Sequence, residues 1–237
     1  MSLAPITKQT KLGIISYDYQ HLKTEQVMLG LHARGFESLT LYTLPFAPRA
    51  EREILFQHRP DMSTGAHTRA LAGALGAQFV ACAGADQIPT DDVDLFLVAG
   101  AGILPASFVS ATRGRVINIH PGIIPLVRGL DAFKWAIVDG MPMGVTMHTI
   151  DEEADAGEVL SIVETPLFET DTLESFAQRH YEIEIMMTVN FDEFVSSAAD
   201  QASYEVRPAR MRMPLAVQEQ LRPAFEDYKA RFAAGPK

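Results

Sequence analysis

Short apolar runs alternate with helical patterns along most of the chain. Apolar runs that end in polar residues predict buried strands, and apolar residues three and four apart predict helices. The expected strands are Lys11–Ser16, Ser38–Thr43, Gln78–Cys82, Leu95–Ala99, Val116–His120, Gly144–His148 and Glu158–Val163. Because strands and helices alternate, parallel right-handed units are expected. The predicted fold class is α/β, with a Rossmann-like, mostly parallel open sheet and helices on both faces.

Helical spacing predicts the segments between and after these strands. The expected helices are Leu22–Arg34, Thr68–Leu75, Asp131–Val138 and a long helix over 173–195. Beyond it, Leu221, Phe225, Tyr228 and Phe232 recur at helical spacing. We therefore expect a domain over residues 1–200 and a C-terminal helical extension over 201–237. This extension is expected to pack on the sheet or to cover a partner subunit, which would make a homodimer.

Composition narrows the class of protein. The 237 residues are 47% hydrophobic, which is ample for a core, and the net charge of −10 disfavours a nucleic-acid partner. No apolar run approaches the length of a membrane span, and the N-terminal residues do not read as a secretory signal. The single cysteine, Cys82, lies in an apolar run and is expected to be buried. These features indicate a cytoplasmic protein without membrane partners, internal disulfides or a cysteine-based metal site.

Three polar residues carry the strongest chemical signal. Asn118 and His120 lie two apart on one expected strand, so their side chains share a face. Asp155 follows His148 by seven residues, inside Asp-Ala-Gly. An amide and an imidazole can donate to a developing oxyanion, and a carboxylate can orient the imidazole or accept a proton. Each motif alone could be turn chemistry, but their joint order indicates a catalytic site.

The stretch from about Asp94 to Glu164 resembles the folate-dependent formyltransferase family, which includes the glycinamide ribonucleotide, methionyl-tRNA and sugar N-formyltransferases. The resemblance implies the formyltransferase fold and a role in one-carbon metabolism. It implies a transferase that moves a formyl group from 10-formyltetrahydrofolate to a primary amine of a small acceptor, without a metal. It also assigns Asn118 and His120 as oxyanion donors, best with His120 protonated, and Asp155 as the proton relay.

The same resemblance implies a folate site made by two loops. Its candidate residues are Gly102, Ile103, Leu104, Val145, Asp151, Glu152, Glu153 and Ala154. For the three apolar side chains, an ordinary place in the core is an equal alternative. Gly102 and Gly157 are expected to allow backbone geometry that other residues cannot reach. Thr146 is expected to give cross-strand polar support, and His148 to support the catalytic side chains.

Departures from the family limit the identity of the acceptor. Gly122 stands where many relatives carry Ser, and Gly102 where the glycinamide ribonucleotide enzymes carry Arg. The first strand–helix turn, Ser16–His21, has no glycine for cradling a phosphate, which disfavours that substrate. Tyr17 and Tyr19 in this turn either stack on an acceptor ring or anchor the turn to the sheet.

Basic residues suggest where an anionic acceptor would bind. Arg49, Arg52, His58 and Arg59 lie in the segment 49–60, on an otherwise acidic chain. The alternative is a solvated helix face with Glu51 and Glu53 as partners. Arg128, just beyond the Asn-x-His strand, is the better-placed anion ligand. The later arginines are expected at the surface or an interface; they are Arg207, Arg210, Arg212 and Arg222.

Two other functions remain open from the sequence. A 10-formyltetrahydrofolate deformylase would use water as the acceptor, but deformylases carry an extra N-terminal domain, and about ten residues precede the first expected strand here. A folate-binding protein without activity is disfavoured by the complete set of three polar residues. A dehydrogenase is disfavoured because the first turn lacks Gly-x-Gly-x-x-Gly.

Overall fold

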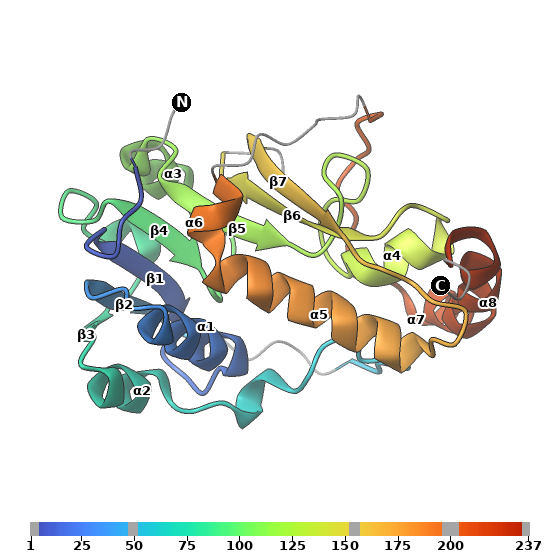
Figure 1. Ribbon diagram of the computed structural model, residues 1–237, viewed down its shortest axis with the longest axis horizontal. Helices are drawn as coiled ribbons and strands as arrows, with labels where there is room; N and C mark the ends of the chain where they lie inside the picture. Colours follow the sequence, from blue (N-terminus) through green and yellow to red (C-terminus); the bar gives the residue numbers. More distant parts are fainter. Residues whose placement is uncertain (1–4, 47–51, 152–156, 196–203, 234–237) are drawn as a thin grey trace.

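A sheet of seven strands runs through the part of the chain that is described (Figure 1). The structure is a computed structural model that describes residues 5–46, 52–151, 157–195 and 204–233. The strands are β1 (Leu12–Tyr17), β2 (Leu39–Leu44), β3 (Gln78–Ala81), β4 (Leu95–Val98), β5 (Val116–His120), β6 (Gly144–Thr149) and β7 (Val159–Glu164). Their order is β3-β2-β1-β4-β5-β6-β7. Strands β1 to β5 are parallel, and β6 is antiparallel to both neighbours. The predicted mostly parallel sheet is therefore confirmed.

The strand order reverses between β1 and β4, and an open α/β sheet binds ligands at the carboxyl ends of its strands near such a point. Ile15 pairs with Val98, so the chain leaves β1 and β4 at the same edge of the sheet. His120, the last residue of β5, reaches this edge from the next strand. Two strand spacings separate β1 from β5, about 10 Å. One ligand can therefore touch both.

Helices cover both faces of the sheet, as the pattern predicts. They are α1 (Leu22–Ala33), α2 (Thr68–Leu75), α3 (Ala106–Thr112), α4 (Ala132–Val138), α5 (Leu173–Val189), α6 (Phe191–Val195), α7 (Leu215–Gln218) and α8 (Leu221–Phe232), with short 3-10 turns at Met62–Thr64 and Ala85–Gln87. Side chains of α1 and α5 share a core with the residues Ile14, Leu41 and Ile119 of the sheet. On the other face, α3 contributes Phe108 to a cluster with Ile15 and Phe96.

The long helix expected to reach Val195 ends earlier, because the backbone leaves helical geometry at Asn190. Arg34 explains this end. Its guanidinium donates to the Val189 carbonyl at 2.9 Å and to the Asn190 side chain at 2.7 Å. A carbonyl that accepts from Arg34 does not need a helical N–H partner, so α6 begins as a separate helix at Phe191. The helix α3 was not predicted.

The C-terminal segment packs on α4 and α5 rather than on the sheet (Figure 1). Phe225 and Tyr228 of α8 contact Phe176 of α5, with ring centroids 5.9 and 6.2 Å apart. Before α8, the chain passes the loop that follows β5, where Gly129 and Arg210 form a parallel bridge. Three of the later arginines bind acidic groups of this chain: Arg207 and Arg210 contact Asp139 at 3.5 and 2.6 Å, and Arg222 contacts Glu174 at 2.6 Å.

One smaller prediction also has an outcome. Cys82 is buried, as expected. In the described parts of the chain, no helix has the length and apolar character needed to cross a bilayer.

Candidate active site

Side-chain alternation on β5 and β6 separates apolar from polar residues. The strands pair antiparallel, with Asn118 opposite His148 and His120 opposite Thr146. The residues between them join the core under α1 and α5; they are Ile117, Ile119, Val145 and Met147. Successive strand residues point to opposite faces, so the four polar side chains share the other face. The sequence pattern therefore builds a polar group on one side of the sheet.

Asn118 is oriented by His148. The Nδ1 of His148 lies 2.8 Å from the Thr149 carbonyl, which can only accept, so Nδ1 carries a proton. In neutral His148 the other nitrogen, Nε2, is then an acceptor, and the Asn118 amide nitrogen donates to it at 3.1 Å. The carboxamide of Asn118 therefore has a defined orientation, with a second N–H left to donate elsewhere.

His120 lies beside this pair and is 3% exposed. Its Nε2 lies 2.8 Å from the Val127 carbonyl. Its ring meets the His148 ring edge to face, with centroids 6.4 Å apart. The structure thus brings Asn118, His120 and His148 together. Asp155 lies outside the described residues.

Thr146 fixes the loop that follows β5. Its hydroxyl donates to the Gly122 carbonyl at 2.7 Å and accepts from the Ile124 amide at 3.1 Å. Both contacts are buried. The expectation that Thr146 gives polar support is confirmed, although it supports the loop backbone and not a side chain across the strands.

The candidate folate residues fall into three groups. Ile103 is 98% exposed in the loop after β4, with Gly102 exposed and Leu104 half-buried beside it. Val145 is fully buried in the core under α1 and α5, which agrees with the alternative of an ordinary core residue. Asp151 is exposed, whereas Glu152, Glu153 and Ala154 lie outside the described residues.

The two glycines of these loops differ. A Cβ at Gly157 would collide with the Thr149 carbonyl, so glycine is needed there. Gly102 faces open space and does not adopt a left-handed φ. The expectation of special backbone geometry is therefore wrong at Gly102, and at Gly157 glycine supplies space rather than a left-handed φ.

A buried ion pair lies between α1, α5 and the segment before α2. Glu184 of α5 is fully buried and contacts Lys23 and Arg59, each at 2.6 Å. Burial alone would raise the pKa of the Glu184 carboxyl, but the charges of Arg59 and Lys23 lower it to about 2. Burial lowers the pKa of Lys23 in spite of this partner.

Sequence reasoning missed Lys23 and Glu184. The available signal was the spacing of α5, where Phe176, His180, Glu184 and Met187 fall on its buried side. A carboxylate in that series must find a cation, because an unpaired buried charge is costly. The pattern predicts a partner but does not identify it.

The arginines of the segment 52–59 bind distant carboxylates. Arg52 contacts Asp131 at 3.2 Å, and Arg59 contacts Glu184. The described part of this segment forms no helix before Met62. Over residues 52–60 the alternative of a solvated helix face is therefore wrong, whereas Arg49 and Glu51 lie outside the described residues.

The first turn is built from aromatic and hydroxyl side chains. Tyr17 meets Phe46 and His21 edge to face, with centroids 5.3 and 5.7 Å apart, which favours an anchoring role. Tyr19 stacks on Phe46 at 5.1 Å, and both remain about four-tenths exposed. His21 lies against Gly100, and its Nδ1 is 2.7 Å from the Thr24 hydroxyl. Burial, with Lys23 and Arg59 nearby, lowers the pKa of His21 to about 4.

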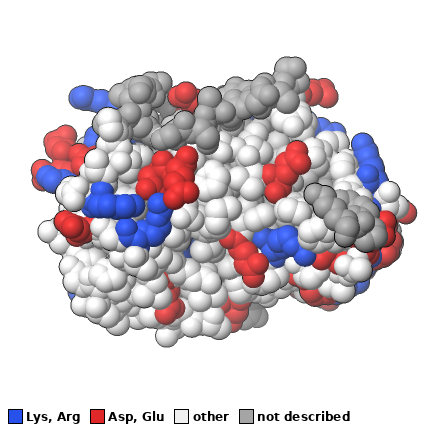
Figure 2. Space-filling view, in the orientation of Figure 1, with Lys and Arg blue, Asp and Glu red and all other residues white. Residues whose placement is uncertain are grey.

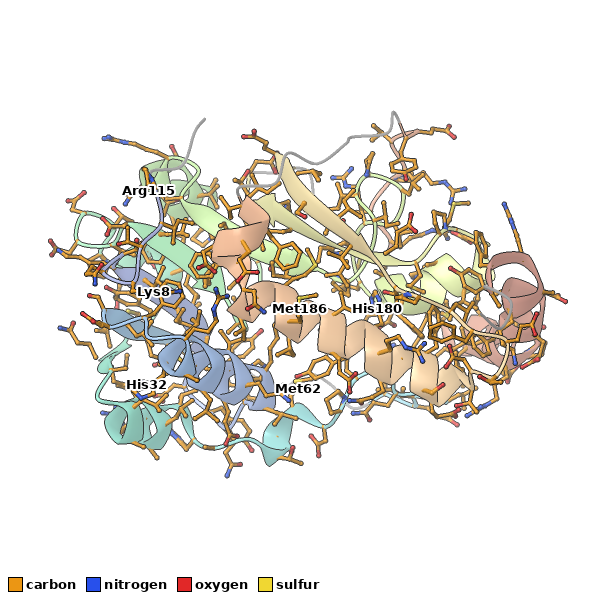
Figure 3. All side chains as sticks on the ribbon, in the orientation of Figure 1. Lys8, His32, Met62, Arg115, His180 and Met186 are labelled. Carbon is orange, nitrogen blue, oxygen red and sulfur yellow. The ribbon has the colours of Figure 1, made fainter. Side chains whose placement is uncertain are left out.

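Two more imidazoles flank the Phe133 ring. His180 projects from the middle of α5 (Figure 3), and its Nδ1 is 2.7 Å from the Thr165 hydroxyl. Its ring centroid lies 5.3 Å from that of Phe133, and His58 stacks on Phe133 at 5.8 Å. Burial lowers the pKa of His180 to about 4 and that of His58 to about 3. Both are therefore neutral at neutral pH.

The surface does not suggest a polyanionic partner on the face seen in Figure 2, where acidic and basic side chains are interspersed. Within the described residues, no group of three or more His, Cys, Asp or Glu is placed to hold a metal ion.

Comparison with known proteins shows what this chain is similar to. Residues 79–190 match the Formyl transferase family. Phosphoribosylglycinamide formyltransferase of Bacillus subtilis is 33% identical over 101 residues, which cover 42% of this chain and 52% of that protein. A methionyl-tRNA formyltransferase of a Geobacillus species is 37% identical over 90 residues, covering 37% of this chain and 28% of the relative. The matched part thus spans about half the length of the first of these relatives.

Solved structures show the same fold. Glycinamide ribonucleotide transformylase 1 of Symbiobacterium toebii superposes with a TM-score of 0.57 at 19% identity, covering 80% of this chain and 87% of that one. Phosphoribosylglycinamide formyltransferase of Streptococcus pneumoniae gives a TM-score of 0.55 at 21% identity, covering 79% and 97%.

Proposed function

Since the chain carries a domain of the Formyl transferase family over residues 79–190, we propose that it transfers a formyl group from 10-formyltetrahydrofolate to a primary amine of a small acceptor. One observation of the site geometry supports this proposal most directly. Asn118 and His120 share one face at the edge of the sheet where β1, β4 and β5 end, called the ligand edge below. His148 orients the amide of Asn118. Such fixed donors are what acyl transfer requires.

The chemistry follows from these groups. The acceptor amine attacks the formyl carbon, and the carbonyl oxygen takes up the electron pair. The Asn118 N–H that does not bind His148 donates to this oxygen. The bond from carbon to the folate nitrogen then breaks. The proton lost by the amine passes through Asp155 to that leaving nitrogen. A protonated His120 adds a second charge-assisted donor.

The loop after β4 is the proposed folate contact. Ile103 is an almost fully exposed apolar side chain, and its loop leaves the sheet beside the end of β5. A flat, partly aromatic ligand would cover it and remove that apolar surface from water. Gly102, Leu104 and the loop from Asp151 to Asp155 complete this proposed contact.

The acceptor is proposed to lie toward β1 and α1, with Arg128, Arg52, Arg59 and Tyr17 as candidate contacts. Arg128 is half-buried in the loop after β5. Arg59 keeps 34% of its side chain exposed while it binds Glu184, so it can reach an anion as well. Arg128→Ala and Arg59→Ala should each raise the acceptor KM about 10-fold, the loss expected for one charged hydrogen bond. Unchanged KM values in both variants would contradict this assignment.

The experiment that tests the function follows 10-formyltetrahydrofolate by absorbance, first with protein alone and then with a panel of amines. Turnover only with an amine, together with a formylated product, would support the transferase and identify its substrate class. Turnover without amine, abolished in Asp155→Ala, would establish a hydrolase instead. Folate binding without any turnover across amino sugars, amino sugar nucleotides and amino acids would contradict the proposed activity.

A further inference from the structure

A backbone carbonyl lies within hydrogen-bond distance of one ring nitrogen of His120. The Val127 oxygen is 2.8 Å from Nε2, and both residues are almost fully buried. A carbonyl oxygen has lone pairs and no proton, so this contact is a hydrogen bond only when Nε2 donates. In neutral imidazole one nitrogen carries the proton and the other accepts. Neutral His120 is therefore the tautomer with its proton on Nε2.

Gly122 makes room for this contact. A Cβ at this position would stand 2.6 Å from the Val127 oxygen, 2.8 Å from His120 Nε2 and 3.2 Å from the Ala132 Cβ. The φ angle of Gly122 is not left-handed, so space and not backbone freedom is what glycine supplies. Any side chain here would push the carbonyl and the ring apart.

The rest of the loop prevents the carbonyl from turning away. Thr146 binds the backbone at Gly122 and Ile124, and the Val127 amide donates to the Ile123 carbonyl at 2.8 Å. Farther along, Arg210 donates through its amide to the Arg128 carbonyl at 2.9 Å and accepts from the Leu130 amide at 2.8 Å. The loop is thus held on both sides of Val127.

We propose that Gly122 and the Val127 carbonyl are positioning groups that fix the tautomer of His120, so that Nδ1 is the nitrogen that serves the reaction. The proposal rests on formyl transfer as the activity of the site. With Nε2 bound to the carbonyl, neutral His120 offers only a lone pair at Nδ1 and acts there as a proton acceptor. Donation from Nδ1 to the oxyanion requires the doubly protonated ring.

The decisive measurement is the ¹⁵N spectrum of the wild-type protein with labelled histidine. The chain has seven histidines, and the variant His120→Gln assigns the signals of His120. In its neutral form, His120 should show a protonated Nε2 and an unprotonated Nδ1. A proton on Nδ1, or a mixture of both tautomers, would overturn the proposal. This spectrum needs no turnover, so it also separates a failure of this proposal from a failure of the proposed activity.

The variant Gly122→Ala tests the role of the space. We expect a mixed or reversed tautomer and a fall in kcat of about 10- to 100-fold, the scale of a displaced catalytic group, with little change in KM. Gly73→Ala is the matched control, because Gly73 lies in α2 with nothing near its Cβ position, and it should change neither quantity. A Gly122→Ala protein with the wild-type tautomer and wild-type kcat would overturn the proposal. If this variant does not fold, the wild-type spectrum still decides it.

Discussion

The two sides of the ligand edge are held by different forces. On β5 and β6, side chains are fixed by hydrogen bonds to one another and to backbone carbonyls, as in the contacts of His148 with Asn118 and Thr149. On the side of β1 and α1, Lys23, Glu184 and Arg59 are fixed by charge. Neutral hydrogen bonds set geometry at a small cost, whereas buried charges must recover a large loss of hydration.

Because the two sides are held differently, substitutions on one side should mainly change the reaction rate, and substitutions on the other should mainly change folding stability. Removing a hydrogen-bonding group from β5 should affect the reaction much more than the fold. Removing the carboxylate from the ion pair should affect the fold first, because two cations lose their partner. Paired measurements of kcat and unfolding therefore test whether the two sides are as distinct as their contacts indicate.

The largest effect is expected on the reaction at Asn118. Asn118→Ala removes the proposed donor to the oxyanion and should lower kcat about 100- to 1000-fold, with a nearly unchanged denaturation midpoint. Steady-state kinetics at saturating folate and amine measures the loss. Asn190→Ala, at the end of α5, is the control and should keep full kcat. A loss below about 5-fold at Asn118 would remove it from the oxyanion site.

The next effect is on folding at Glu184. Glu184→Ala leaves Lys23 unpaired in a buried site and should lower the free energy of unfolding by about 3–5 kcal/mol. Denaturant titration measures it. Glu182→Ala, on the exposed side of the same helix, should change stability by less than about 0.5 kcal/mol. Equal effects in the two variants would show that the ion pair contributes nothing beyond helix packing.

Acidification should weaken the ion pair of Glu184 with Lys23 and Arg59. The pKa of the Glu184 carboxyl is about 2 in the folded protein and about 4.3 in an unfolded chain. Its contribution is therefore complete above about pH 4.3 and is lost as the pH falls toward 2. A hydrogen bond from Arg179 lowers the pKa of Asp171 to about 2, so Asp171 is protonated over the same pH range. The denaturation midpoint measured from pH 5 to 2 should thus fall less in Glu184→Gln than in wild type, and parallel curves would contradict this.

A smaller effect is expected where the C-terminal segment meets the loop after β5. Gly129 has φ of +88°, and a Cβ there would collide with the backbone of Arg210. Gly129→Ala should lower stability by about 2 kcal/mol or more, because crowding adds to backbone strain. Gly114→Ala is the matched control, since Gly114 has φ of +76° and open space around it, and it should lose only about 1 kcal/mol. Thermal unfolding of both variants separates crowding from strain, and equal losses would mean that the bridge is not tightly packed.

The same contrast explains what the sequence could predict. The strand β5 was predicted with the bounds that the structure has, and the placement of Asn118 and His120 on one face followed from strand alternation. Asn118 and His148 are 30 residues apart, within one strand–helix–strand pattern. Local periodicity carries this kind of information.

Contacts between distant segments were not predictable in the same way. Glu184 meets partners 161 and 125 residues away, and no local pattern around Arg59 or Lys23 indicates this pairing. The end of α5 at Asn190 depends on Arg34, which lies on another helix. The tautomer of His120 depends on how closely a loop folds back, and Gly122 looked only like a departure from the family pattern. Each of these features is decided by packing that periodicity does not encode.

The bridge between Gly129 and Arg210 also sets an order of events in time. Arg210 follows Gly129 by about eighty residues, and a ribosome adding roughly 5–20 residues per second needs about 4–16 s to make them. During that interval, β5 and its loop exist in the growing chain while the segment that pins the far side of the loop does not. The loop that follows His120 therefore receives its contacts with Arg210 only near the end of translation, and a chain interrupted before Arg210 would carry Asn118 and His120 without them.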